Sequence, residues 1–148
     1  MGRNNVKRES AEVIRDCIAT RLRMANRVVT KVYDDALRPF GLKVTQLSML
    51  VVAENRGVIR QSEVGAELQL DDSTLSRNLE RMRANGWLEA VPADDARVHS
   101  YQLTAAGRAL LDKAIPAWRC AQGEAQRLLG GAGVQALRRF ARDRGFDG

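Results

Sequence analysis

The sequence DDSTLSRNLERMRANGWL, residues 71–88, decides the fold. Leu75, Leu79 and Met82 follow one another at spacings of four and three residues, which places them on one face of an α-helix. Most of the other side chains in this segment are polar or charged and point to the opposite side. The stretch is therefore predicted to be an amphipathic helix whose outer face is free to meet a partner.

The outer face of this helix begins with short polar side chains. Its first turns carry three hydroxyl groups and one arginine, on Ser73, Thr74, Ser76 and Arg77. Hydroxyl groups hydrogen-bond phosphates and bases, and an arginine can bind guanine O6 and N7 together. Serine and threonine are also ordinary first-turn residues behind an N-cap such as Asp71 or Asp72. We predict that this face contacts DNA, with a purely structural role as the alternative for its hydroxyl groups.

The composition is that of a folded, basic protein. The chain has 148 residues, which suits one domain, and its 45% hydrophobic and 28% charged residues are typical of globular proteins. Its 24 lysine and arginine residues outnumber 18 acidic ones, and 20 of the 24 are arginine. The net charge of +6 favours a polyanionic partner. A GC-rich genome would also explain the arginine content, so the positions of the arginines must decide.

Several classes of protein are not indicated. The basic N-terminus is followed by no signal-peptide core, and no apolar run approaches the roughly 18 residues of a membrane span, so we expect a cytoplasmic protein without membrane contact. Cys17 and Cys120 lie far apart in no metal-ligand spacing, which predicts neither a disulfide framework nor a metal site. With a single histidine and no Gly-rich phosphate loop, we predict no enzyme and no cofactor.

The N-terminal part is predicted to form one long amphipathic helix. It runs from about Glu9 to Arg38 without glycine or proline, and Pro39 then ends it. Its apolar residues recur every three or four positions, at Ile14, Ile18, Leu22, Ala25, Val29, Val32 and Ala36. A helix of this length needs a partner along its apolar face.

The rest of the chain is predicted to form shorter helices, a hairpin and a second long helix. In order, we expect a helix from its cap Thr45 to Asn55, a helix around 62–68, the quoted helix, strands over 87–91 and 98–103, a helix over 105–129 capped by Thr104, and a helix over 134–142. Residues 92–97 are expected to form the hairpin turn, and Pro116 to kink the long helix. The glycines within 130–133 predict a loop.

This order of elements predicts a mainly α-helical fold with a small β-hairpin. Two helices joined by a short turn and followed by a hairpin form a winged helix-turn-helix, whose second helix enters the DNA major groove while the hairpin reaches beside it. We find no internal repeat and no linker long enough to split the chain. Residues 1–148 are therefore predicted to form one domain with flanking N- and C-terminal helices.

Several motifs together resemble the MarR family of bacterial transcription regulators. They are Gly41-Leu42, the quoted helix, Asp95-x-Arg97 in the hairpin and Leu103-Thr104-x-x-Gly107, in this order within residues 22–111. The resemblance implies a homodimer in which the helices of 9–40 and 105–144 intertwine, with a DNA-binding module over 42–104. It also implies binding of a pseudo-palindromic operator in double-stranded DNA, and repression relieved by a small aromatic, acidic or phenolic effector.

The hairpin is predicted to make a second contact with DNA. Arg97 near its tip can enter a minor groove, where the potential is most negative, and Asp95 can hold the guanidinium by a charge-assisted pair. The family carries the same Asp-x-Arg pattern. His99 is a further predicted contact, to phosphate, although a lone imidazole beside a hairpin is more often a polar surface residue. For Arg97 the alternative is a solvated loop charge.

An effector site is expected between the terminal helices and the winged module, because ligand pockets form at such interfaces. The residues predicted for it are Arg23, Met24, Arg27, Tyr33 and Trp118. An arginine among them would pair with an acidic ligand. Methionines and aromatic residues at helical spacing are usually core residues, which is the alternative explanation for three of the five.

Two other functions remain open. A thiol-oxidation-responsive regulator would use Cys17 or Cys120, which lie on the predicted dimerisation helices. In the peroxide-sensing branch of the family, however, the reactive cysteine corresponds to Ala19, about 200° around the helix from Cys17, and cysteines are common core residues. The second alternative is a winged-helix adaptor for protein or RNA, because fold does not dictate function.

Overall fold

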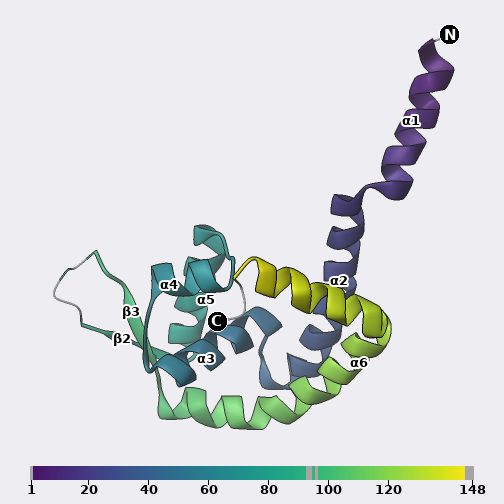
Figure 1. Cartoon of the computed structure of the whole chain (residues 1–148). Coiled ribbons are helices and arrows are strands. Elements are labelled where there is room, and N and C mark those ends of the chain that lie inside the picture. The colour runs from purple at the N-terminus through teal and green to yellow at the C-terminus, as the bar shows by residue number, and fades with distance from the viewer. Residues whose placement is uncertain (1, 93–94, 96, 146–148) are drawn as a thin grey trace.

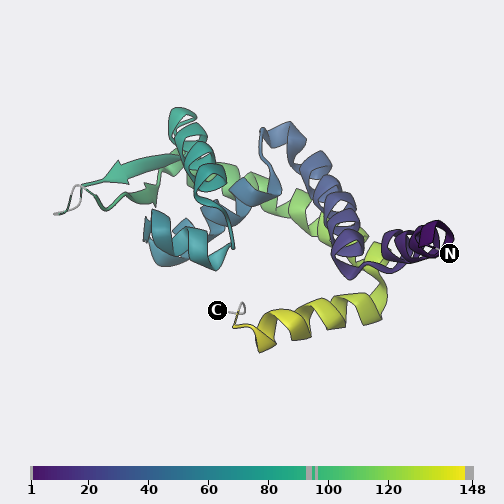
Figure 2. The same ribbon diagram turned by 90° about the horizontal axis from the view of Figure 1, so that it is seen from above.

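The computed structural model of the chain describes residues 2–92, 95 and 97–145. The elements in chain order are α1 (Gly2–Asp16), α2 (Ile18–Leu37), the 3₁₀-helix η1 (Arg38–Phe40), α3 (Val44–Arg56), β1 (Val58–Arg60), α4 (Gln61–Glu67), α5 (Asp72–Ala84), β2 (Leu88–Val91), β3 (Ser100–Leu103) and α6 (Ala105–Asp143). Figures 1 and 2 show the hairpin projecting from one end of the molecule and α1 projecting from the other. The predicted fold class, mainly α with a small β wing, is confirmed.

The hydrophobic core lies between α3, α5, the sheet and the first half of α6. Leu75, Leu79 and Met82, the predicted inner face of α5, are at most 1% exposed. Leu50 of α3 and Ile59 of β1 belong to the same cluster and are equally enclosed. The quoted helix is thus fixed on the body of the module by its apolar side, with its polar side outward.

The wing belongs to a three-stranded antiparallel sheet in the order β1-β3-β2. The hairpin of β2 and β3 was predicted, but β1 was not: it pairs with β3 so that Arg60 lies opposite Ser100. A strand of three residues is too short to show an alternating pattern, so only its pairing reveals it. Strand β3 begins at Ser100 and not at Val98. The carbonyl of His99, directly before the strand, accepts a hydrogen bond from the backbone N–H of Gln61 at 2.9 Å.

Two predicted helix caps are present. The Asp71 carboxylate accepts a hydrogen bond from the backbone N–H of Thr74 at 2.8 Å and so caps α5. The Thr104 hydroxyl oxygen accepts one from the backbone N–H of Gly107 at 3.0 Å and caps α6. These contacts satisfy N–H groups that have no partner within the first turn of a helix.

The predicted cap Thr45 is wrong, because α3 begins at Val44 and its N-cap position is Lys43, two residues before Thr45. The Val44 N–H donates to the carboxylate of Asp34, on α2, at 2.9 Å. The Lys43 N–H donates to the side-chain oxygen of Gln46 at 3.0 Å. A carboxylate ten residues away replaces the local hydroxyl, and it joins the end of α2 to the start of α3.

The predicted single N-terminal helix is also wrong, because it is two helices. Cys17 has extended backbone angles (φ −63°, ψ 112°) between α1 and α2, and α1 starts well before Glu9. The guanidinium of Arg21 donates to the carbonyl of Arg15, at 2.9 Å from its Nε, and so satisfies a carbonyl that the break leaves free. The sequence has no glycine or proline here, so no local signal predicted the break.

Helix α6 is broken at Gly130, whereas it continues through Pro116 and curves along this part of its length (Figure 1). Pro116 lies inside the helix, whereas Gly130 has φ 69° and ψ 164°, angles that are open mainly to glycine. The predicted loop over 130–133 is reduced to this one residue, since the residues after it are helical. Figure 1 shows the last segment of α6 folding back toward the winged module.

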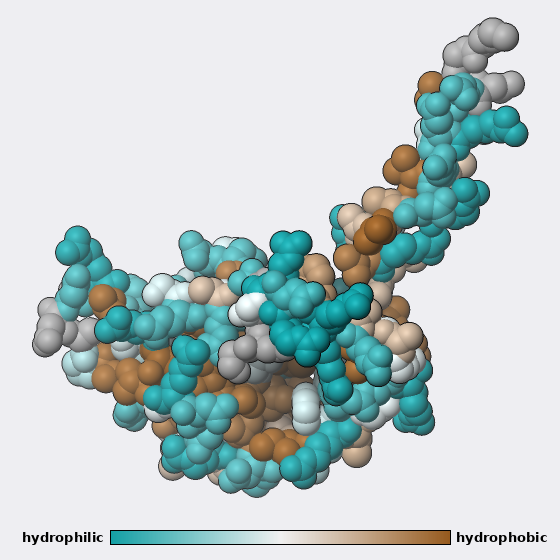
Figure 3. Space-filling model, viewed as in Figure 1, coloured by the Kyte–Doolittle hydropathy of each residue, from teal (hydrophilic) through white to brown (hydrophobic). Residues whose placement is uncertain are grey.

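The terminal helices carry most of the exposed apolar side chains. Among the described residues, ten of the twelve large hydrophobic side chains that are exposed lie on α1, α2 and α6: Val6, Val13, Ile14, Ile18, Leu22, Met24, Val28, Leu128, Leu137 and Phe140. Figure 3 shows apolar residues along the projecting α1 and the adjoining part of α2. No helix among the described residues combines the length and the apolar character needed to cross a bilayer.

Candidate nucleic-acid interface

The first turn of α5 is organised around the Asp71 carboxylate. Besides the backbone cap, Asp71 accepts hydrogen bonds from the hydroxyl groups of Ser73 at 2.7 Å and Thr74 at 2.6 Å. These contacts, that of the Thr74 hydroxyl foremost, hold the pKa of Asp71 well below its usual range. Both hydroxyl groups therefore donate their hydrogens within the helix cap. This is the structural role that the sequence left open as the alternative to DNA contact.

Arg77 lies on the exposed side of α5, one turn after Ser73. Its Nε donates to the Ser73 carbonyl at 3.1 Å, and a terminal nitrogen donates to the Ser73 hydroxyl oxygen at 3.2 Å. These contacts are with solvent-exposed groups, so the guanidinium can exchange them for other acceptors at little cost. Arg77 is thus a cation on the exposed side of α5 that a partner can contact.

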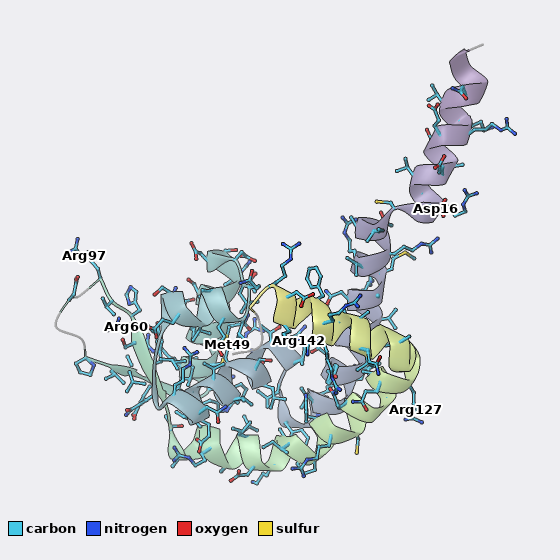
Figure 4. The ribbon with its side chains drawn as sticks, viewed as in Figure 1. Asp16, Met49, Arg60, Arg97, Arg127 and Arg142 are labelled. Atoms are coloured by element: carbon cyan, nitrogen blue, oxygen red, sulfur yellow. The ribbon has the colours of Figure 1, made fainter. Side chains whose placement is uncertain are left out.

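The predicted pair in the wing is present. The Asp95 carboxylate accepts hydrogen bonds from Nε of Arg97 at 3.2 Å and from its backbone N–H at 2.9 Å, and the backbone contact is the first cause that lowers the pKa of Asp95. The Arg97 side chain is 91% exposed. Figure 4 shows it at the far end of the wing. Ala93, Asp94 and Ala96 of the predicted turn lie outside the described residues.

A hollow of about 850 Å³ separates the returning arm of the wing from the first turn of α5. Arg97 and His99 line it on the wing side, Asp71 and Asp72 on the α5 side, and Arg60 at the base of the wing. The structure therefore brings the predicted wing residues and the start of the predicted recognition helix to the same side of the molecule.

Ser76 is bonded to a neighbouring helix, α4. It is half-buried, and its hydroxyl oxygen accepts a hydrogen bond from the side-chain amide of Gln61 at 3.0 Å. Gln61, which also lines the hollow, was not predicted. The two residues are 15 positions apart on different helices, so no sequence pattern could have revealed the contact.

The end of α5 is joined tightly to the start of α6. The Thr104 hydroxyl donates to the carbonyl of Gly86 at 2.6 Å, and the Thr104 amide donates to the carbonyl of Trp87 at 3.1 Å. A side-chain carbon on Gly107 would overlap the Trp87 carbonyl and lie 2.8 Å from a methyl carbon of Leu103. Only glycine lets α6 pass this close to the residues that follow α5.

Comparisons with known proteins agree on one family. The model described as MarR family matches residues 40–97. A structure of the transcriptional regulator MosR from M. tuberculosis in complex with DNA is 38% identical, with 86% of this chain and 92% of that one covered and a TM-score of 0.75. A MarR-family regulator from Rhodococcus sp. RHA1 is 25% identical, with 90% and 95% covered and a TM-score of 0.76.

The chain belongs to the MarR family of transcription regulators. Among curated relatives, the uncharacterised HTH-type transcriptional regulator YwoH of Bacillus subtilis is 31% identical over 78 residues, which are 53% of this chain and 57% of that protein. The chain thus matches somewhat more than half the length of this relative. The MarR-family matches favour neither the adaptor nor the thiol-oxidation alternative over a DNA-binding regulator.

The five effector residues predicted from the MarR resemblance are not gathered at one place. Arg23 and Met24 are exposed on α2. Tyr33 is half-buried and donates a hydrogen bond from its hydroxyl to the side chain of Gln122, and burial raises the pKa of Tyr33. Trp118, one turn before Gln122, packs against the core. Tyr33 thus supports the contact between α2 and α6, and Trp118 adds to the core, as the core alternative had it.

Arg27 of this set lines a hollow. The hollow has a volume of about 760 Å³ and lies between α2 and the start of α3. Its charged residues are four cations and two carboxylates: Arg27, Lys31, Arg38, Lys43, Asp34 and Asp35. Asp35 pairs with Lys31 and Arg38, and the hydrogen bond from Lys31 is the first cause that lowers its pKa.

Both cysteines are free. Cys17 is half-buried at the break between α1 and α2, and hydrogen bonds from Thr20, foremost from its backbone N–H, lower the pKa of the Cys17 thiol. Cys120 is exposed on α6. The thiol-oxidation hypothesis for this member of the MarR family stays a prediction.

Proposed function

We propose that the protein is a homodimeric, sequence-specific DNA-binding transcription regulator of the cytoplasm. The observation that carries the proposal is the shared hollow, flanked by the Arg97 arm of the wing on one side and the polar first turn of α5 on the other. A helix that enters a major groove and a cationic wing that reaches the adjacent groove need this arrangement. The relative MosR, 38% identical, has been solved in complex with DNA.

Within this proposal, the predicted DNA contacts are Ser73, Thr74, Ser76, Arg77, Asp95, Arg97 and His99. Arg77 and Arg97 are the two exposed guanidinium groups of the set, and they would bind a base or phosphate directly. Ser73 and Thr74 would act through the cap and through their remaining acceptor positions. Asp95 would orient Arg97.

The dimer is supported by the apolar faces that a single chain leaves uncovered. Ile14 and Ile18 are each 75% exposed, and Leu128 and Phe140 on α6 are more than half exposed. Monomeric proteins rarely leave such a series of large apolar residues in water. The domain would then divide as predicted, into dimerisation helices over 9–40 and 105–144 and a DNA-binding module over 42–104, so that two modules meet a pseudo-palindromic operator.

We further propose that the protein is a repressor released by a small acidic, aromatic or phenolic ligand. The support is the hollow lined by Arg27, which carries two more cations than carboxylates and lies between α2 and residues 41–43, directly before α3. An anion bound there would compete for Lys31 and Arg38 with Asp35 and would alter the contact between a terminal helix and the winged module.

The test is a binding titration with genomic fragments captured by the protein. We expect one duplex to be preferred over bulk DNA by roughly 10³-fold or more, with an affinity that falls steeply as salt rises. Arg97→Ala should weaken binding to that duplex several-fold. Arg127→Ala, which removes an exposed arginine at the opposite end of the molecule (Figure 4), should leave the affinity unchanged.

Two results would contradict the proposal. A folded Arg97→Ala protein with unchanged affinity would remove the wing from the interface. If no duplex competed better than bulk DNA, or if single-stranded RNA competed best, sequence-specific DNA binding itself would be excluded.

A further inference from the structure

Gln61 connects the two parts of the interface that are proposed to touch DNA. Its backbone N–H donates to the His99 carbonyl in the returning arm of the wing at 2.9 Å. Its side-chain amide donates to the Ser76 hydroxyl oxygen on α5 at 3.0 Å. Gln61 is the first residue of α4 and follows directly after Arg60, which pairs with Ser100 of the wing. One half-buried residue thus bonds to both the wing and the recognition helix.

The direction of the second bond determines what Ser76 can do. A serine hydroxyl has one hydrogen to donate and two positions at which to accept. The Gln61 amide occupies one accepting position, so the hydroxyl hydrogen must point away from it. Within the described residues Ser76 donates to no acceptor, whereas the hydroxyl hydrogens of Ser73 and Thr74 are both directed at Asp71.

We propose that Gln61 is a positioning residue that holds the Ser76 hydroxyl as a hydrogen-bond donor toward DNA. The partner of Ser76 would be an acceptor on the duplex: a phosphate oxygen, or a base acceptor such as guanine O6 or N7. Gln61 itself need not touch the nucleic acid. This inference rests on the proposed function, because it assigns a role within the same interface.

A change at position 61 that reverses the bond separates this role from simple packing. Gln61→Glu keeps the shape of the side chain but offers only acceptor oxygens, so the Ser76 hydroxyl would turn toward the carboxylate and lose its free hydrogen. The change also adds a negative charge near DNA. Gln69→Glu is the matched control, because Gln69 lines the same hollow but its side chain donates only to the nearby carbonyl of Ala66.

The experiment is a double-mutant cycle on operator affinity, with Gln61→Glu and Ser76→Ala made singly and together. We expect Gln61→Glu to weaken binding about tenfold more than Gln69→Glu. In the Ser76→Ala background this excess should disappear, because the hydroxyl on which Gln61 acts is gone. Gln61→Met, which cannot donate or reverse the bond, should weaken binding less than Gln61→Glu. Thermal unfolding of each variant shows whether it is folded.

Three outcomes would overturn the inference. Gln61→Glu and Gln69→Glu could weaken binding equally, which would leave charge as the cause. The excess could persist in full in the Ser76→Ala protein, or Gln61→Met could be as harmful as Gln61→Glu, which would leave packing as the cause. All three presuppose a wild-type protein that prefers one duplex. A wild type without such a preference would refute the proposed function and this inference with it.

Discussion

The winged module and the terminal helices differ in how their apolar side chains are accommodated. In the module, the inner faces of α3 and α5 are enclosed by the sheet and by the start of α6 within a single chain. In the terminal helices, α1 has no buried side chain among its described residues, and the exposed large apolar residues of the molecule concentrate on α1, α2 and α6. The module therefore encloses its apolar side chains within one chain, whereas the terminal helices leave much of theirs exposed.

The largest effect should follow from a cavity in the module. Leu79→Ala removes a side chain that is 1% exposed, and we expect a loss of about 2–5 kcal/mol in the free energy of unfolding. Urea denaturation measures it. The neighbouring exposed residue is the control: Glu80→Ala should cost less than about 0.5 kcal/mol. Equal losses for the two variants would mean that Leu79 is not packed in the core of the module.

The close contact between α6 and the residues after α5 can be tested by adding a side-chain carbon at Gly107. Gly107→Ala would force a carbon into the Trp87 carbonyl, and we expect a loss of about 1–3 kcal/mol. Gly123→Ala, farther along the same helix, meets nothing within 4 Å and should be neutral or stabilising. Both are measured by thermal or urea unfolding. A Gly107→Ala protein as stable as the wild type would refute the close contact.

Substitutions on the terminal helices should change the association of two chains and leave the folding of the winged module unchanged. Leu22→Glu places a charge on the exposed apolar face of α2, and we expect the dissociation constant of the dimer to rise at least about tenfold. Val58→Glu alters a similarly exposed apolar residue on β1 and should leave association unchanged. Sedimentation velocity over a range of concentrations distinguishes the two. The same dissociation constant for both variants would contradict a dimer built on α2.

The smallest effect is the pH dependence of the α5 cap. The folded pKa of Asp71 lies below its unfolded value, so the carboxylate contributes stability that is complete above the unfolded value and is lost as the pH falls toward the folded one. Relative to Asp71→Asn, which caps without titrating, the wild type should lose stability progressively below about pH 4. Urea denaturation at a series of pH values measures it.

Thr74→Val sharpens this prediction, because the Thr74 hydroxyl is the first cause of the lowered pKa of Asp71. Without this hydroxyl, the folded pKa of Asp71 lies closer to the unfolded one, so the loss of stability should still begin near the unfolded value but should be smaller and end at a higher pH than in the wild type. A pH profile identical to that of the wild type would mean that the hydroxyl does not hold the carboxylate.

Features that depend on neighbouring residues were predictable from the sequence. The helix over residues 72–84, its cap Asp71 and the cap Thr104 were correct because each rests on contacts within a few positions of the chain. The pair of Asp95 and Arg97 was predictable for the same reason. The contacts of these side chains with DNA are not decided by the fold and remain predictions.

Features that depend on distant residues were missed. Strand β1 exists only through its pairing with β3, and the cap of α3 comes from Asp34 on another helix. The break at Cys17 has no glycine or proline to announce it. The hydrogen bond from the Gln61 side chain to Ser76 joins two helices over 15 positions. The hydrogen bond from Tyr33 on α2 to Gln122 on α6 likewise joins residues 89 positions apart.

The joint at Thr104 couples the two regions mechanically. Its hydroxyl donates to the Gly86 carbonyl and its amide to the Trp87 carbonyl, both of which follow α5. The same residue caps α6, and Gly107 lets this helix lie directly against the Trp87 carbonyl. The 25 residues from Ala105 to Leu129 form a helix about 37 Å long at 1.5 Å per residue, which Figure 1 shows curved along its length. We expect a displacement of its far end to reach α5 through this joint, because the helix is unbroken between the two.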